Sequence, residues 1–185
     1  MFKMLPMRPV ARQCAIRGFK TTRPTLFKAG DSVPTGLKGL QETSPGNSID
    51  IGKEVAKGKT IIVGLPAAFS PACSASHVPG YIKHLPELKQ KGVSQVLVTT
   101  VNDSFVTQAW SEALKCPKEV RIIADTQGEF ARAGGHLFDS KHIFGNERSV
   151  RYAAIVEDGK VVKEFVEPDK IGVDVSSAEN ILKNL

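Results

Sequence analysis

The sequence lacks the features that mark several large classes of protein. Its 185 residues include only three cysteines, Cys14, Cys73 and Cys116, and no Cys-x-x-Cys pair. These widely separated thiols supply neither a disulfide framework nor a zinc-binding set, and the four histidines lack metal-ligand spacing, so we expect no metal and no cofactor. No apolar run approaches the roughly 20 residues that span a bilayer, which predicts a soluble protein without a membrane partner.

Acidic residues are absent from the first 30 positions, where seven of the 25 basic residues lie. The rest of the chain carries 18 basic against 19 acidic residues, so it offers no basic surface for nucleic acid. The basic segment, with apolar residues between spaced arginines, predicts a mitochondrial transit peptide over residues 1–24, cut near residues 19–24, and a location in the mitochondrial matrix. A disordered basic tail is the alternative.

From residue 59 onward, short apolar runs alternate with helical patterns, which predicts buried strands separated by helices. We expect strands at residues 60–65, 95–101, 120–124, 151–156 and 160–166, and helices at 71–90, 104–114, 128–132 and from 176 to near 182. This order predicts an α/β protein with a thioredoxin-like fold, in which a central mixed sheet has helices on both faces. The folded domain is expected over residues 25–185, with an irregular lead at 31–58 that holds one hairpin at most.

Local signals refine this outline. The tripeptide Glu157-Asp158-Gly159 joins two apolar runs and predicts a β-hairpin. Asp103 is a suitable N-cap for the second helix, and residues 176–179 (Ser-Ser-Ala-Glu) indicate a capping box for the last one. Pro79 and Pro86 are expected to kink or break the first helix.

The segment between the first strand and the first helix carries the candidate chemistry. Pro71 suits the first position of a helix, which places Cys73 in its first turn. There, free backbone N–H groups and the positive end of the helix dipole favour a thiolate over a thiol. Ser70 can set its hydroxyl beside the sulfur, and Pro66 would shield the pocket and fix the loop. The alternative is that Cys73 is a small buried apolar residue, as most lone cysteines are.

The same segment resembles the active-site signature of peroxiredoxins: a proline, three residues, a threonine or serine, two residues and a cysteine. Here these positions hold Pro66, Ser70 and Cys73, with serine in place of the more usual threonine. The resemblance is to the mitochondrial form of the type II (fifth-class, atypical) peroxiredoxins and covers about residue 31 to the end. It rests on four runs in order: GLPAAFSPACSASHVPGY (64–81), VNDSFV (101–106) followed by Ala109 and Trp110, FGNERSVRY (144–152), and SSAE (176–179) followed by Ile181 and Leu182.

The resemblance implies a homodimeric thiol peroxidase that reduces hydrogen peroxide and organic hydroperoxides to water and alcohols. Cys73 would be the peroxidatic cysteine, which becomes a sulfenic acid. Arg151 aligns with the family's arginine and the nearby Arg148 does not. A guanidinium at that place would stabilise the thiolate and hold peroxide oxygens; a solvated charge at a strand end is the alternative. His77, on the helical face of Cys73, either helps to hold the thiolate or is structural.

The sulfenic acid is expected to be reduced by an external thiol. Relatives that form a disulfide often carry a second cysteine in the C-terminal part, where the counterpart falls near Val175, or in the N-terminal lead, which has none after residue 30. Cys116 occupies neither place, so we expect a one-cysteine cycle with glutathione, glutaredoxin or thioredoxin as reductant. Two other functions stay open: a disulfide reductase, which the missing Cys-x-x-Cys pair disfavours, and a non-catalytic thioredoxin-fold chaperone or redox-relay binding module.

Overall fold

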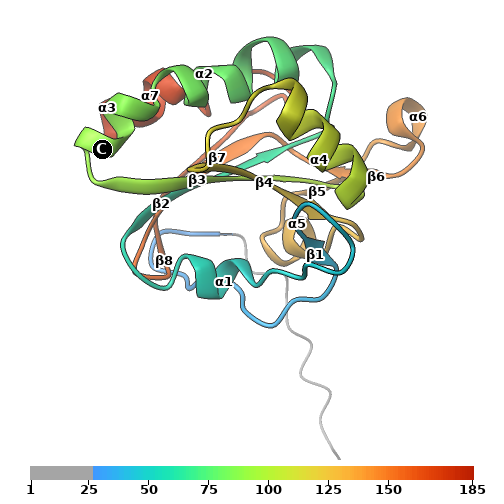
Figure 1. The fold of residues 1–185 in the computed structure, drawn as a ribbon, viewed down its shortest axis with the longest axis horizontal. Helices are drawn as coiled ribbons and strands as arrows, with labels where there is room; N and C mark the ends of the chain where they lie inside the picture. The colour runs from blue at the N-terminus through green and yellow to red at the C-terminus, as the bar shows by residue number, and fades with distance from the viewer. Residues whose placement is uncertain (1–26) are drawn as a thin grey trace, which may run out of the picture.

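The computed structural model describes residues 27–185 of the chain (Figure 1). The transit peptide expected over residues 1–24, together with Cys14, lies outside the described residues. Within residues 27–185, the helices are all too short or too polar to cross a bilayer.

A six-stranded mixed sheet forms the centre of the molecule. Its strands are β1 Leu40–Gln41, β2 Lys59–Leu65, β3 Val93–Thr100, β4 Val120–Asp125, β7 Tyr152–Glu157 and β8 Lys160–Val166. They lie in the order β1-β4-β3-β2-β7-β8. The three middle strands β4, β3 and β2 are parallel, whereas β7 and β8 on one side and β1 on the other pair antiparallel. This arrangement confirms the thioredoxin-like fold.

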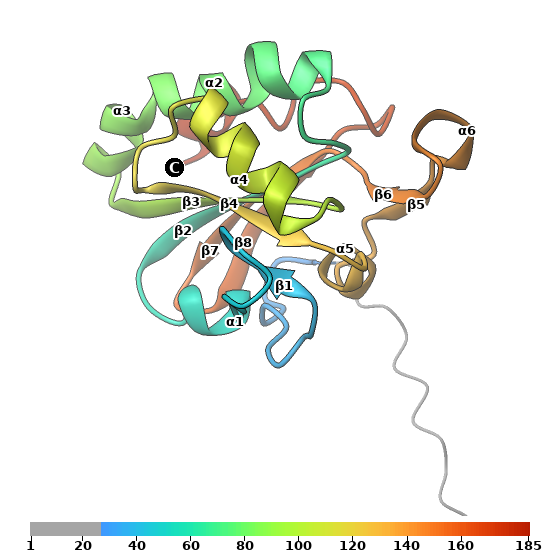
Figure 2. The ribbon, with the colours of Figure 1, turned by 45° about the vertical axis from the view of Figure 1, so that its right-hand side comes forward.

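Helices cover both faces of the sheet. They are α1 Ile51–Glu54, the π-helix Cys73–His77, α2 Val78–Lys83, α3 Leu85–Gln90, α4 Ser104–Ala113, α5 Glu129–Ala133, α6 Lys141–Phe144 and α7 Ala178–Asn184. In Figures 1 and 2, α2, α3, α4 and α7 lie on one face, and α1 and α5 on the other. Along β2, Ile61 and Val63 belong to the apolar cluster on the first face and Ile62 to the cluster on the second, as the two-residue period of a strand requires.

Two local predictions are confirmed in detail. Asp158 and Gly159 both have positive φ, 48° and 78°, and form the tight two-residue turn between β7 and β8 that favours this pair of residues. Asp103 caps α4, since its carboxylate accepts a hydrogen bond from the backbone N–H of Val106 at 2.9 Å. The five predicted strands and four predicted helical regions all form, with ends displaced by a few residues.

The capping box predicted over residues 176–179 is wrong. The N-cap of α7 is Ser177, whose hydroxyl accepts from the backbone N–H of Asn180 at 3.3 Å. The hydroxyl of Ser176 instead donates to the carboxylate of Glu167 at 2.6 Å, because a charged acceptor makes the stronger hydrogen bond. The helix also continues to Asn184, past the expected end near residue 182.

The helix predicted over residues 71–90 is divided into pieces, as its prolines suggested. Residues 71 and 72 are helical, a π-helix follows over Cys73–His77, and α2 ends at Lys83. Pro79 has no N–H to bond the carbonyl four residues earlier, and the wider π-turn removes that requirement. Pro86 lies in the first turn of α3, where a missing N–H leaves no partner unpaired.

Several short elements escaped prediction. The lead over residues 31–58 is less irregular than expected, because β1 pairs with β4 and α1 packs Ile51 into the core. A second sheet of two strands, β5 Leu137–Asp139 and β6 Glu147–Ser149, flanks α6. Elements of two to four residues are too short to show a hydrophobic period in the sequence.

Gly64 makes a close approach between β2 and β7. It pairs with Tyr152 across the sheet, and a Cβ atom added at Gly64 would overlap the Tyr152 ring at Cε1. We expect Gly64→Ala to lower the free energy of unfolding by about 3 kcal/mol, the upper end for overpacking, as measured by urea denaturation. Gly46→Ala is the control, since its Cβ would meet nothing within 4 Å. Equal denaturation midpoints for the two variants would contradict the packing argument.

Candidate active site

Cys73 lies beyond the carboxyl end of β2. The strand ends at Leu65 and the helix begins at Pro71, so Cys73 stands in the first helical turn as expected. Phe69, in the loop between them, has φ of 59°, a left-handed conformation that is uncommon outside glycine. The side chain of Cys73 is fully buried and belongs to the apolar cluster under α2 and α7.

Arg151 reaches Cys73 because of the register between β2 and β7. Gly64, next to the end of β2, pairs with Tyr152, the first residue of β7. Arg151 therefore lies beside the loop that carries Cys73. Its Nη1 donates to Cys73 Sγ at 3.3 Å, and its Nε donates to the carbonyl of Ile171 at 2.9 Å. Only 2% of Arg151 is exposed, so it is not a solvated charge at a strand end.

Among the described residues, the guanidinium of Arg151 has no carboxylate in direct contact. Within residues 27–185, none of the ion pairs involves Arg151. A buried cation without an opposite charge is unfavourable. Cys73, in direct contact with it, is a group that can supply a negative charge. A negative charge that forms on the sulfur during a reaction would therefore lie within hydrogen-bonding distance of the guanidinium.

A small pocket of about 260 Å³ opens beside this pair. Its lining comprises Pro66, Ser70, Pro71, Ala72, Ile143, Phe144, Arg151 and Ile171. Pro66, Ser70 and Arg151, all predicted from the sequence, thus share one pocket. The hydroxyl of Ser70 does not bond the sulfur in this structure; it donates to the carbonyl of Ala67 at 3.0 Å. Arg151 lines this pocket, whereas Cys73 is fully buried and is not one of the lining residues.

His77 contacts Arg151, which links it to the sulfur. Its Nδ1 accepts from Arg151 Nη1 at 3.1 Å, and its Nε2 lies 3.0 Å from the carbonyl oxygen of Ser176. Burial, and then the charge of Arg151, lower the pKa of His77 to about 4. His77 is therefore neutral at physiological pH, as an acceptor toward a guanidinium has to be.

Sequence reasoning missed Ser176 as a member of this site and missed Glu167 altogether. Both lie in the C-terminal part, and the hydroxyl of Ser176 donates to Glu167. Their spacing of nine residues follows no helical or strand period, and Ser176 lies in a segment that resembled a helix cap. Nothing in the sequence pattern marks the pair.

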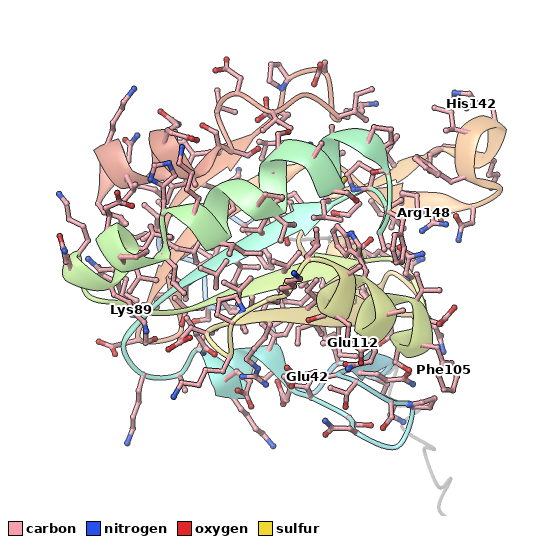
Figure 3. All side chains as sticks on the ribbon, turned by 45° about the horizontal axis from the view of Figure 1, so that its top comes forward. Glu42, Lys89, Phe105, Glu112, His142 and Arg148 are labelled. Atoms are coloured by element: carbon pink, nitrogen blue, oxygen red, sulfur yellow. The ribbon has the colours of Figure 1, made fainter. Side chains whose placement is uncertain are left out.

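Arg148 is occupied elsewhere, although it is close to Arg151 in sequence. Its Nε donates to Asn146 Oδ1 at 2.7 Å, its Nη1 donates to the carbonyl of Val101, and its guanidinium lies over the ring of Phe144. Figure 3 shows Arg148 at the end of the molecule that carries α6. The choice of Arg151 over Arg148 as the partner of Cys73 agrees with this geometry.

Cys116 lies at the opposite edge of the sheet from Cys73. Cys73 follows the carboxyl end of β2, whereas Cys116 precedes the amino end of β4, and these strands are parallel. The seven residues of β2 separate the two edges by about 20 Å. Cys116 is half-buried, and burial raises the pKa of its thiol above the ordinary value. A disulfide between the two would need a large rearrangement.

Known proteins are similar to this chain in sequence. The redoxin family profile matches residues 28–182. The chain is 47% identical over 132 residues to the peroxisomal membrane associated protein 20 of Schizosaccharomyces pombe, which covers 70% of this chain and 84% of that protein. It is 38% identical to peroxiredoxin-2D of Arabidopsis thaliana, over 84% of this chain and 96% of that one.

A solved structure extends the likeness to three dimensions. Reduced Prx3 from Vibrio vulnificus in complex with hydrogen peroxide superposes with a TM-score of 0.78 at 34% identity, over 86% of this chain and 100% of that one. A match of this extent in both sequence and fold shows the family. The chain belongs to the redoxin family and is a peroxiredoxin, a thiol-dependent peroxidase.

Proposed function

We propose that the thiolate of Cys73 attacks the terminal oxygen of a hydroperoxide bound in the pocket and becomes a sulfenic acid. The observation that carries this proposal is the buried guanidinium of Arg151, which donates to Cys73 Sγ at 3.3 Å and has no carboxylate partner among residues 27–185. A thiolate neutralises this cation, and the cation lowers the free energy of the thiolate.

The step is a displacement at oxygen. The sulfur forms a bond to the terminal peroxide oxygen as the O–O bond breaks, and the leaving oxygen keeps the electron pair and takes a proton from water. The products are the sulfenic acid and an alcohol, or water when the substrate is hydrogen peroxide. Arg151 and Ser70 line the pocket; their guanidinium and hydroxyl groups orient the peroxide and stabilise the charge on the leaving oxygen.

Two small movements accompany substrate entry. Cys73 has no exposed surface, so the peroxide has to displace lining side chains to reach Sγ. The hydroxyl of Ser70 is bonded to the carbonyl of Ala67, and rotation about its Cα–Cβ bond frees it for the peroxide. Pro66 at the start of the loop limits how far the backbone follows.

The size and the walls of the pocket support organic hydroperoxides as further substrates. Its volume of about 260 Å³ far exceeds the roughly 30 Å³ share of a water-sized molecule. Ile143, Phe144 and Ile171 form apolar walls, which can bury the alkyl group of a larger peroxide. Hydrogen peroxide, which has no alkyl group, would use only the polar lining residues Ser70 and Arg151.

The catalytic cycle uses one cysteine of the chain. Cys116, at the other edge of the sheet and with a raised thiol pKa, is a poor resolving thiol, and the C-terminal counterpart position is near Val175. An external thiol therefore attacks the sulfenic acid, and a second thiol equivalent returns Cys73 to the reduced form. Glutathione, glutaredoxin and thioredoxin are the candidate reductants.

Mass spectrometry of the reduced protein after one equivalent of peroxide tests both the nucleophile and the cycle. We expect a single added oxygen on Cys73, trapped by a reagent for sulfenic acids, and the same result in Cys116→Ser. A Cys73–Cys116 disulfide would overturn the one-cysteine cycle but keep the nucleophile. Unmodified Cys73 alongside oxidised Cys116 would overturn the nucleophile itself.

The proposal also includes a homodimer in the mitochondrial matrix, with a mature domain over residues 25–185. A dimer interface would cover exposed apolar side chains such as Phe105, Ile143 and Phe69, which are 69%, 60% and 55% exposed. The seven basic residues among the first 30 support mitochondrial import. Light scattering tests the assembly, and import into isolated mitochondria tests the location.

A further inference from the structure

A chain of buried hydrogen bonds runs from the active-site arginine to a carboxylate that touches neither the sulfur nor the pocket. Arg151 Nη1 lies 3.1 Å from His77 Nδ1, and His77 Nε2 lies 3.0 Å from the carbonyl oxygen and 3.2 Å from the hydroxyl of Ser176. The Ser176 hydroxyl donates to Glu167 Oε1 at 2.6 Å. Arg151, His77, Ser176 and Glu167 are all buried.

The donors and acceptors along this chain fit in one way only. A guanidinium has donors and no acceptor, so His77 Nδ1 has to accept from Arg151. The ring proton of neutral His77 then lies on Nε2, which donates to the carbonyl of Ser176. That carbonyl also accepts from the hydroxyl of Tyr81 at 2.6 Å. The Ser176 hydroxyl donates its only proton to Glu167, so toward His77 this oxygen can act only as an acceptor.

Glu167 holds the turn that presents the Ser176 carbonyl. Its Oε1 accepts from the backbone N–H groups of Asp174 and Ser176, both at 2.8 Å, as well as from the Ser176 hydroxyl. Burial alone would raise the pKa of Glu167, but these hydrogen bonds together lower it, so the carboxylate is charged at neutral pH. Without it, two buried amides and a hydroxyl lose their acceptor.

We propose that Glu167 is a positioning residue for peroxide reduction: it keeps the ring proton of His77 on Nε2, and thereby leaves Nδ1 free to aim Arg151 at Cys73. The inference rests on the proposed function, in which Arg151 stabilises the thiolate and orients the peroxide. Nη1 carries two hydrogens, and with one directed at His77 Nδ1 the other points toward Cys73 Sγ. A proton on Nδ1 would instead face the guanidinium and push it away.

Several other charged or titratable groups lie near these hydrogen bonds, and each of them contributes to any dependence of the reaction on pH. The charges of Arg151 and Glu167 shift the pKa of the His77 ring in opposite directions, and Tyr81 packs edge-on against the ring. Asp169 interacts with the charge of Arg151, and Glu179 with Tyr81. Asp174 and Glu179 line a separate polar pocket on another side of His77.

The direct test is the ring tautomer of His77 in the reduced full-length protein, read from long-range ¹⁵N–¹H NMR correlations of the imidazole. At neutral pH we expect a neutral ring protonated on Nε2. In Glu167→Leu we expect a population protonated on Nδ1, and a rate of peroxide reduction about 10- to 100-fold lower, the scale of a misplaced catalytic group. Glu167→Gln retains an acceptor oxygen and is expected to keep most of the rate and the wild-type tautomer.

A matched control comes from the other face of the sheet. Glu164 accepts from the buried His136 at 2.7 Å, so Glu164→Leu removes a similar carboxylate–histidine contact away from Cys73. We expect it to leave the His77 tautomer and the peroxide rate unchanged. Should Glu167→Leu fail to fold, Ser176→Ala removes one link of the chain, and we expect a smaller rate loss with the same shift in tautomer.

Two results would overturn the proposal. One is a wild-type His77 protonated on Nδ1 at neutral pH. The other is a folded Glu167→Leu, or Ser176→Ala in its place, with the wild-type tautomer and the wild-type rate. A wild-type protein that shows the expected tautomer yet consumes no peroxide would refute the proposed function and not the hydrogen-bond chain, so the two failures are distinguishable.

Discussion

Replacing Cys73 with serine is expected to lower the rate of peroxide reduction by 10⁴-fold or more, on the order of what removal of a catalytic nucleophile costs. A serine hydroxyl does not ionise near neutral pH, so it can neither attack the peroxide as an anion nor neutralise the charge of Arg151. The change replaces one atom in a fully buried site, so the fold is expected to remain. The measurement is peroxide consumption with dithiothreitol in excess.

Cys116→Ser is the matched control for this experiment. It alters the other thiol within residues 27–185 at the opposite edge of the sheet, and we expect it to retain the wild-type rate. Wild-type consumption by Cys73→Ser, or its loss in Cys116→Ser, would show that a different sulfur performs the chemistry.

Arg151→Lys is expected to lower the rate by about 10²-fold, the cost of losing one preorganised donor to a developing charge. Lysine keeps the positive charge but ends in a single ammonium group. It cannot bond Cys73, His77 and the Ile171 carbonyl from one rigid plane as the guanidinium does. The variant therefore separates the effect of the charge from the effect of its placement.

Two measurements distinguish these effects. Peroxide kinetics report on orientation of the substrate, and the pH dependence of Cys73 alkylation by iodoacetamide reports on the thiolate. We expect Arg151→Lys to lower the rate of peroxide reduction more than it lowers the rate of Cys73 alkylation at neutral pH. We expect Arg151→Met to lower both rates strongly. Arg148→Lys is the control, because Arg148 bonds Asn146 and Val101, and a similar loss there would remove the special role of Arg151.

The strands and helices of the central layer could be predicted because their local signals agree with their final surroundings. The apolar run of β2 is buried on both faces, and Asp103 caps the helix it was expected to cap. Cys73 could be predicted for the same reason, since Pro71 and the end of a strand mark the first turn of a helix. The family resemblance added Arg151, which the residues alone would have left as a surface charge.

The remaining features depend on contacts between distant parts of the chain. The strand β1 exists because β4 offers it an edge, and two residues carry no period of their own. The hydroxyl of Ser176 does not cap the helix as expected, because it donates a hydrogen bond to the carboxylate of Glu167, nine residues earlier. The contact of His77 with Arg151 joins residues 74 positions apart, and no local pattern encodes such a pair.

In the proposed one-cysteine cycle, the distance between Cys73 and Cys116 determines how long Cys73 stays oxidised. Within residues 27–185 no other sulfur lies at hand for the sulfenic acid, so its lifetime depends on how often a thiol arrives from solution. When thiols are scarce, a second peroxide converts the sulfenic acid to a sulfinic acid, which ordinary thiols do not reduce. Survival of the catalyst is thereby tied to the thiol supply of its compartment as much as to the peroxide it meets.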